Sequence, residues 1–238
     1  MPKPAKRSSR STPARAKGRV ARAPRRGPPV AASFEEVWRL REEERLPSLV
    51  GPLEPGIVTL DEVPSLTEQY GDWEPLWNAF GVLRSAPSEQ RRTYLYVTSG
   101  LTTPVYFEKT VGFDSNAPSG CGYEIAIETP KHVDWPVLRL LSMMAYNLGT
   151  RRAFAAGHRW PFGGPVDGKR STIVACVFVE DGAFALPTGR AKLLRAVGIT
   201  AEELAYAKEH GSEALIPLLA TGPGLVTPVR RPSVVRSA

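Results

Sequence analysis

The chain has 238 residues, of which 42% are hydrophobic and 23% are charged, the ordinary composition of a globular domain. Its longest apolar run covers residues 173–179, far short of the roughly 20 residues that a membrane-spanning helix needs. Two cysteines are too few for a disulfide scaffold. Composition therefore excludes a transmembrane protein and a disulfide-rich one, and we expect a cytoplasmic protein.

The net charge of +7 comes from the N-terminus. Residues 1–30 hold ten Lys and Arg and no acid, whereas the remaining residues hold 21 basic and 24 acidic side chains. The same stretch holds six prolines and almost no large apolar residue, so it cannot bury enough surface to offset the entropy of ordering. We therefore expect a disordered basic tail over residues 1–30 and a single, mildly acidic domain over residues 31–238.

Three interpretations of the tail stay open. Its cations could contact nucleic acid without regard to sequence, and the candidates are Arg15, Lys17, Arg19, Arg25 and Arg26. A transit peptide has the same Arg- and Ser-rich, acid-free composition, but the scattered prolines oppose the amphipathic helix that it needs. The third interpretation is a solvated extension, read from a start codon upstream of the real one. A twin-arginine export signal is excluded because Gly-Pro-Pro follows the arginine pair without an apolar stretch.

The domain begins with helical patterns. Ser33 and Glu36 have the spacing of a capping box, which predicts a helix over residues 34–45. The prolines and glycines of residues 47–64 end that helix and predict a loop. Aromatic and leucine residues at helical spacing then predict one or two short helices over residues 65–83.

The pattern changes to strands after residue 92. β-Branched and aromatic residues predict strands over residues 93–98, 105–107 and 122–128, and residues 225–229 fit a last strand. The continuous apolar run within residues 171–180 is typical of a strand in the middle of a sheet, where both faces are buried.

Four further helices are expected among these strands. Asp134 is placed to cap a helix over residues 135–148, and a short helical segment follows at 151–156. A second capping-box spacing starts a helix at Thr200 that ends near residue 209, and another runs over residues 212–220. The elements together predict one α+β domain with a mixed sheet flanked by helices.

No catalytic constellation emerges from the motifs. Residues 163–169 match the start of a phosphate-binding P-loop, but Arg170 replaces the required Ser or Thr and the loop precedes a strand instead of opening a helix, so an ordinary turn is favoured. Cys121, between two glycines, is the better candidate for a reactive thiol, and Cys176 lies within an apolar strand. His158 could act as a general base, but its place after a predicted helix favours hydrogen bonds to the last carbonyls.

No metal site or cofactor is predicted. His132, His158 and His210 stand at no metal-ligand spacing from one another or from a cysteine. An enzyme that uses Cys121 or His158 is kept as an alternative hypothesis.

The order of the segments is more informative than any one motif. The stretches that carry this information are residues 96–102 (Tyr-Val-Thr-Ser-Gly-Leu-Thr), 118–125 (Pro-Ser-Gly-Cys-Gly-Tyr-Glu-Ile), 135–141 (Trp-Pro-Val-Leu-Arg-Leu-Leu), 157–158 (Gly-His), 187–189 (Pro-Thr-Gly), 197–200 (Val-Gly-Ile-Thr), 202–204 (Glu-Glu-Leu) and 215–219. In this order and spacing, the chain resembles the Suppressor of fused domain family over about residues 60–235. The resemblance also favours a strand at 190–197, where periodicity alone predicts a helix.

The resemblance implies a protein-binding module and not an enzyme. Animal members of the family hold a transcription factor by a short peptide that adds as a strand beside the domain. Those members carry a further C-terminal domain, which we expect this chain to lack. Bacterial members are commonly single-domain proteins, and some are grouped with immunity proteins that bind and neutralise toxins. We therefore expect a protein or peptide partner, such as a toxin domain, with nucleic-acid contact through the tail as the alternative.

The resemblance also suggests where a partner would bind. In the animal form an acidic residue precedes the Pro-Ser-Gly segment, and Asn116 stands at the matching position, so a charge-assisted contact would be lost. Asp114 could substitute if the loop shifts, and Tyr106 lies near the place of an aromatic groove residue. The candidate partner-binding residues are Tyr106, Asp114, Asn116 and Ser119. Solvation of Asn116 and core packing of Tyr106 are equally good interpretations of those two residues.

Overall fold

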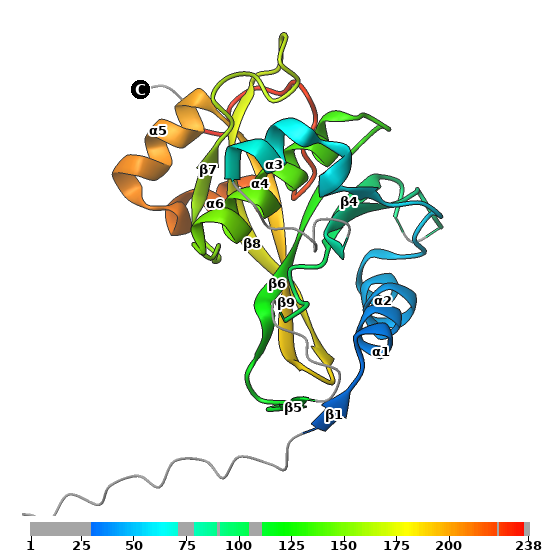
Figure 1. Ribbon diagram of the computed structural model, residues 1–238. Coiled ribbons are helices and arrows are strands. Elements are labelled where there is room, and N and C mark those ends of the chain that lie inside the picture. The colour runs from blue at the N-terminus through cyan, green and yellow to red at the C-terminus, as the bar shows by residue number, and fades with distance from the viewer. Residues whose placement is uncertain (1–29, 71–78, 90, 105–110, 223, 236–238) are drawn as a thin grey trace, which may run out of the picture.

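The structure, a computed structural model, describes residues 30–70, 79–89, 91–104, 111–222 and 224–235 (Figure 1). Its elements in chain order are β1 (Val30–Ala32), α1 (Phe34–Arg39), the π-helical η1 (Leu40–Arg45), α2 (Leu46–Val50), β2 (Val58–Thr59), the 3₁₀-helical η2 (Leu60–Glu62), α3 (Pro64–Tyr70), β3 (Gly81–Ser85), β4 (Tyr94–Ser99), β5 (Val111–Phe113), β6 (Pro118–Thr129), α4 (Trp135–Thr150), β7 (Arg159–Pro161), β8 (Ile173–Leu186), β9 (Gly189–Thr200), α5 (Ala201–His210) and α6 (Ser212–Thr221).

Seven strands form a mixed sheet in the order β2-β3-β4-β6-β9-β8-β7. β6 and β9 run parallel at its centre, and every other neighbouring pair is antiparallel. β1 and β5 form a separate two-stranded sheet beyond the lower end of β6 in Figure 1. The fold class predicted from the sequence is confirmed, and β9 confirms the strand that the resemblance favoured at 190–197.

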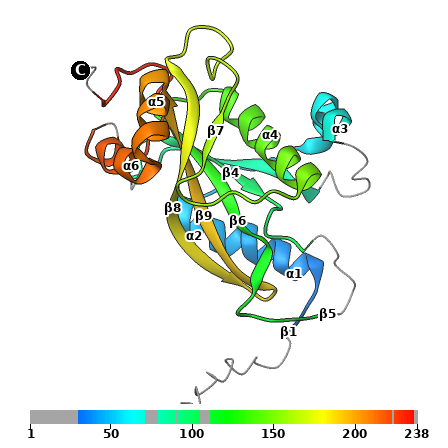
Figure 2. The same ribbon diagram turned by 90° about the vertical axis from the view of Figure 1, so that its left-hand side faces the viewer.

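α3 and α4 cover one face of the large sheet (Figure 2). Successive side chains of a strand point to opposite faces, so Tyr96, Ile125 and Phe178 face this layer. They pack with Leu140, Met144 and the other inward residues of α4 into the largest core cluster. Met143 and Met144 of α4 are therefore core residues, as flexible apolar side chains often are.

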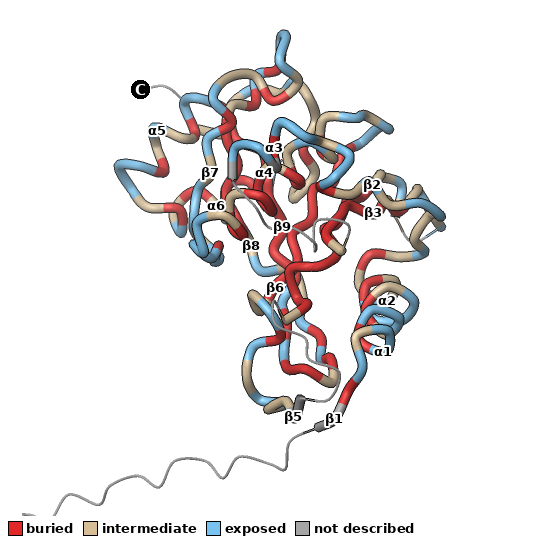
Figure 3. Tube along the Cα trace, viewed as in Figure 1, coloured by how far each residue is buried: buried red, intermediate tan, exposed pale blue. Residues whose placement is uncertain are grey.

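Two groups of helices cover the opposite face. α1, η1 and α2 pack on its lower part, where Val37 and Leu46 meet Leu193. α5 and α6 pack on its upper part, where Leu215 meets Val177. Figure 3 shows buried residues along β6 and β9 in the middle of the sheet and exposed residues on the outward turns of α1 and α5.

The first helical stretch is longer than its sequence pattern predicts. Ser33 accepts a hydrogen bond from the amide of Glu36 at 3.1 Å, so the predicted cap is confirmed. The helical stretch then continues through η1 and α2. It ends at Gly51, whose φ of 79° lies in the left-handed region. Pro47 does not end it and lies within α2, inside the continuous helical stretch.

Several other boundaries differ from the sequence prediction. Residues 81–85 form strand β3, although the pattern over 65–83 predicted helix; residues 71–78 lie outside the described part of the chain. Neither the helix predicted at 151–156 nor the strand predicted at 225–229 is present. The strand predicted at 105–107 falls outside the described residues.

α4 begins and ends differently from its prediction. Asp134 occupies the N-cap position, but its side chain makes no capping hydrogen bond. The helix also runs past Gly149 and ends at Arg151, whose φ of 57° places a non-glycine residue in the left-handed region.

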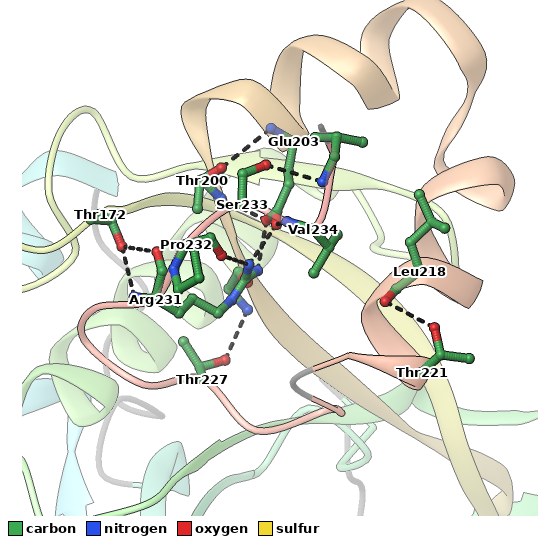
Figure 4. Close-up of polar contacts among 12 residues, drawn as sticks. Thr172, Thr200, Glu203, Leu218, Thr221, Thr227, Arg231, Pro232, Ser233 and Val234 are labelled. Carbon is green, nitrogen blue, oxygen red and sulfur yellow. Dashed lines mark hydrogen bonds and ion pairs between the residues drawn. The ribbon is translucent and has the colours of Figure 1, made fainter. Parts of the chain in front are cut away.

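The segment after α6 is fastened to the start of α5 (Figure 4). Glu203 accepts from the amide of Thr200 at 2.9 Å, which completes the predicted capping box, and from Nη2 of Arg231 at 2.6 Å. The carboxylate of Glu203 is fully buried, so this bidentate ion pair offsets the cost of its desolvation. In addition, the amide of Gly198 donates a hydrogen bond to the hydroxyl of Thr227 at 2.8 Å.

Candidate functional site

Asp114 and Asn116 lie in the loop between β5 and β6, and Ser119 lies at the start of β6. The carboxylate of Asp114 accepts from the amide of Asn116 at 2.9 Å, and its backbone carbonyl accepts from the amide of Ala117 at 3.0 Å. These bonds form an Asx turn that fixes the loop. Asp114 is half-buried and Asn116 is exposed. Tyr106 and the tail residues Arg15, Lys17, Arg19, Arg25 and Arg26 lie outside the described residues.

The tip of the β8–β9 hairpin meets this loop. The guanidinium of Arg190 donates to the side-chain oxygen of Asn116 at 3.2 Å, and the amide of Arg190 donates to the carbonyl of Ala117 at 2.8 Å. The two segments thus form one surface, and we call residues 114–117 and 188–190 the tip surface. No pattern in the sequence assigned Arg190 to this surface, because its partner lies in the loop between β5 and β6, far away in the sequence.

Gly189 lets the two segments approach each other. Its φ is 140°, and a Cβ at this position would lie 2.2 Å from the carbonyl oxygen of Ala117. Only glycine satisfies both constraints. The Pro-Thr-Gly stretch at 187–189 was one of the stretches carrying the family resemblance, which was the available signal for this contact.

Ser119 supports the tip surface from inside the domain. Its side chain is fully buried, and its hydroxyl donates to the carbonyl of Thr102 at 2.7 Å and contacts the hydroxyl of Thr188. The Pro-Ser-Gly segment at 118–120 is the first part of β6. Direct contact between Ser119 and a partner remains a prediction that this burial does not favour.

A buried carboxylate anchors the chain segment that leads out of β4. Glu124 is fully buried and accepts hydrogen bonds from the hydroxyls of Thr98 and Thr102, at 2.6 and 2.7 Å. It also accepts from the amides of Gly100 and Thr102, at 3.2 and 2.9 Å. Burial raises the pKa of Glu124, and the charge of Arg41 and the donors oppose that rise.

Arg41 ties the N-terminal helices to the same segment. Its side chain is fully buried, and it donates to the hydroxyls of Ser99 at 2.9 Å and Thr103 at 2.6 Å. It also lies 3.4 Å from a carboxylate oxygen of Glu42. Arg41 was missed in the sequence because the surrounding run of charges resembles a solvated helix face. The buried side chains of Glu124 and Arg41 therefore both hold residues 98–103, at the end of β4 and just after it.

Burial raises the pKa of both cysteine thiols. Cys121 lies half-buried in β6 and donates to the side-chain oxygen of Asn147 at 3.1 Å. Burial, together with the charge of Glu124, raises the pKa of Cys121 to about 11, so its thiolate is scarce at neutral pH. Burial also raises the pKa of Cys176, and its side chain is fully buried as predicted.

The other catalytic candidates were His158 and the P-loop-like segment at residues 163–169. His158 is exposed in the connection before β7, not at the end of a helix. In the P-loop-like segment, the carboxylate of Asp167 accepts from the amides of Lys169, Arg170 and Ser171 at 2.9–3.1 Å. This segment is an ordinary turn before β8, as predicted. Within the described ranges, no three His, Cys, Asp or Glu residues are grouped as metal ligands.

None of the helices among the described residues is both long and apolar enough to span a membrane.

The comparisons with known proteins agree with this architecture. Residues 77–232 match the family model of the Suppressor of fused protein (SUFU), and no curated protein matches the chain. A solved structure described as the Sufu-Fu complex is 19% identical, with a TM-score of 0.59, over 87% of this chain and 93% of that chain.

Two further structures have the same fold. Drosophila Suppressor of Fused is 19% identical, with a TM-score of 0.60, over 88% of this chain and 52% of its own. A Suppressor of fused homologue from Neisseria gonorrhoeae FA 1090 is 15% identical, with a TM-score of 0.56, over 84% of this chain and 98% of its own. The family match covers well over half of the sequence and confirms the resemblance seen in its motifs: the chain belongs to the Suppressor of fused protein family.

Proposed function

We propose that this chain is a non-enzymatic protein-binding module whose partner binds at the tip surface and at the adjoining edge of β5. One observation carries the proposal. Two segments far apart in the sequence converge at residues 114–117 and 188–190, joined by hydrogen bonds from Arg190, and the buried hydroxyls of Ser119 and Thr188 meet beneath them. Such a surface is fixed before binding, so little conformational entropy is lost when a partner docks.

The neighbouring strand supplies a way to hold an extended peptide. β5 ends at Phe113, directly before Asp114, and belongs to a sheet of only two strands. A strand added to such an edge gains main-chain hydrogen bonds, while pockets beside it select the side chains. The Sufu-Fu complex supports the proposal, because it shows that a protein of this family binds another protein.

The partner that fits best is a toxin domain in a bacterium. The similarity to a Neisseria gonorrhoeae homologue over nearly all of that homologue's length supports a bacterial setting. In this proposal the chain is a cytoplasmic immunity protein that blocks the toxin by occupying its surface. No catalytic step is needed, which agrees with the raised pKa of Cys121.

Nucleic-acid binding through the tail is the second candidate function. The observation that favours it is the group of ten Lys and Arg without an acid in residues 1–30. Such a contact would weaken steeply with salt, because each cation releases counterions from the phosphates. It would also be lost when the tail is deleted, whereas binding at the tip surface would persist.

The test is affinity capture from the native host after nuclease treatment, with the retained proteins identified by mass spectrometry. The full chain and residues 30–238 are compared, each also as Asn116→Arg and as Lys169→Ala, the latter an exposed residue of the turn before β8. We expect both lengths to retain the same protein, Asn116→Arg to lose it and Lys169→Ala to keep it. Retention that needs the tail and is removed by nuclease would contradict the proposal and support the second candidate.

The immunity role has its own readout. The retained protein is expected to be toxic when expressed alone and harmless when expressed with this chain. Asn116→Arg is expected to abolish the protection. A partner that is not toxic would contradict the immunity role and leave the binding function in place.

A further inference from the structure

The small two-stranded sheet joins residues that are far apart in the sequence. β1 pairs antiparallel with β5, in the register Val30 with Phe113, Ala31 with Gly112 and Ala32 with Val111. Figure 1 shows this pair beyond the lower end of the large sheet, where the chain leads from β5 into β6. β5 therefore already accepts an added strand, and the chain itself donates that strand.

The pairing is short and spans three register pairs. Ala32 and Phe113 pack against the core cluster beneath α1, and Ser33 then caps α1 directly after β1. An isolated two-stranded sheet is marginally stable in water, so β1 belongs to the part of a fold that opens most readily.

The position of β1 matters because β5 borders the tip surface. Asp114 and its Asx turn follow Phe113 without a gap, so a strand on β5 lies next to the residues that we propose a partner contacts. A donor and a partner strand cannot use the same amides and carbonyls of β5 at once. In the free chain β1 thus covers one of the two edges of β5.

We propose that β1 is an internal occupant of the strand-binding position on β5, which a partner's extended segment displaces. The displacement of β1 by a partner rests on the proposed function, whereas the occupation of β5 by β1 does not. A strand tethered in cis acts at an effective concentration of roughly millimolar, so it excludes weak competitors and yields to a partner with additional contacts at the tip surface. β1 therefore makes binding at β5 selective for partners that also contact the tip surface.

The first test measures occupancy by hydrogen exchange in the full chain. The variant Val30→Pro/Ala31→Pro loses two consecutive amide donors, so at least one ladder bond is removed whichever residue donates. Exchange at residues 111–113 is expected to rise about tenfold, with α4 unchanged. The matched control Val30→Thr/Ala31→Ser keeps both amides and is expected to behave like the unmodified chain. Equal exchange at residues 111–113 in all three chains would overturn the proposal.

The second test asks whether β5 accepts a strand in trans. The probe is a synthetic peptide with the sequence of residues 28–34, Pro-Pro-Val-Ala-Ala-Ser-Phe, added at several millimolar to the proline variant. It is expected to restore slow exchange at residues 111–113, whereas a peptide with prolines at the Val30 and Ala31 positions does not. Rapid exchange that neither peptide slows would overturn the docking role of β5.

The third test uses a reversible lock. Register partners on antiparallel strands have Cα atoms within the range of a disulfide, so Ala31→Cys/Gly112→Cys is expected to cross-link β1 to β5 on oxidation. The oxidised chain is expected to lose the partner identified by capture, and reduction is expected to restore it. Unchanged binding in the oxidised chain would overturn the displacement. Failure of the unmodified chain to bind any partner would instead count against the proposed function, and the first two tests would still decide the occupancy.

Discussion

Arg190, in the β8–β9 hairpin, and Asn116, in the loop between β5 and β6, are joined by a hydrogen bond of 3.2 Å from the guanidinium to the side-chain oxygen. Both side chains are exposed, and the adjacent backbone bond from Arg190 to Ala117 fixes their separation. The position at which animal relatives are expected to carry an acidic residue thus holds a neutral acceptor beside an arginine. This arrangement leaves most of the charge of Arg190 available to a partner.

Asn116→Asp is expected to stabilise the tip surface slightly. The new carboxylate would pair with Arg190, and an exposed pair of this kind contributes about 0.2–1 kcal/mol. Urea unfolding at low salt measures the gain, which should shrink in high salt. Asn116→Ala is the control without an acceptor. Equal stability of the two variants at low salt would contradict the contact.

Gly189→Ala is expected to destabilise the chain by about 1–3 kcal/mol and to weaken partner capture. The added methyl group would meet the carbonyl oxygen of Ala117 at 2.2 Å, in addition to the strain of a φ of 140°. Urea unfolding gives the loss of stability.

Gly163→Ala is the matched control for this substitution. Gly163 has a φ of 76°, and among the described residues no heavy atom apart from its chain neighbours lies within 4 Å of the position that the added methyl group would take, so only backbone strain of about 1 kcal/mol is expected. An equal loss of stability in the two variants would show that the close approach of Gly189 to Ala117 is unimportant.

Glu124 is expected to leave a signature in the pH dependence of stability. Burial raises its pKa in the folded chain, so the native state binds this proton more tightly than the unfolded state does. Its contribution to the free energy of unfolding therefore rises as pH falls from neutrality through the folded pKa toward the ordinary carboxyl range. Glu124→Gln cannot take up this proton.

The comparison uses urea unfolding of both chains between about pH 7 and pH 5. At pH 7 the variant is expected to be less stable by about 1–3 kcal/mol, because the amide nitrogen of Gln would face donors. The gap should widen toward pH 5, since only the unmodified chain gains from protonation. A gap that stays constant or narrows would contradict the raised pKa.

Cys121 is expected to react slowly with alkylating reagents. A pKa of about 11 leaves roughly 100-fold less thiolate at neutral pH than an unperturbed cysteine has. Iodoacetamide labelling of the native chain, followed by mass spectrometry, measures the rate, and the urea-unfolded chain supplies the reference. Cys121→Ser assigns the remaining signal to Cys176. Labelling of Cys121 as fast in the native chain as in the unfolded one would reopen the enzyme hypothesis.

Much of the fold was readable from local chemistry. The caps at Ser33 and Thr200 set helix starts correctly, because a capping hydrogen bond needs only residues three apart. Periodicity failed at 190–197, where the leucines and valine of β9 pack into three different core clusters in a buried sheet. A strand with both faces buried has no alternation to detect, and the family resemblance supplied the missing information.

The candidate site was readable only in part. Asp114 and Asn116 could be named because the resemblance marked their loop. Arg190 and Gly189 could not, because they reach this loop from the β8–β9 hairpin. Arg41 was hidden for a different reason: its guanidinium is buried by contacts with β4 and the loop after it, which no helical pattern records. Tertiary contacts of this kind have no local signal.

The most direct test of the account is site-specific photo-cross-linking to the captured partner. A photoreactive phenylalanine analogue is placed at Asn116, at Arg190 or, as the control, at Lys169 in the turn before β8. We expect partner cross-links from positions 116 and 190 and none from 169, with or without nuclease. A partner that cross-links from 169 but from neither tip position would contradict the central claim that the tip surface is the binding site.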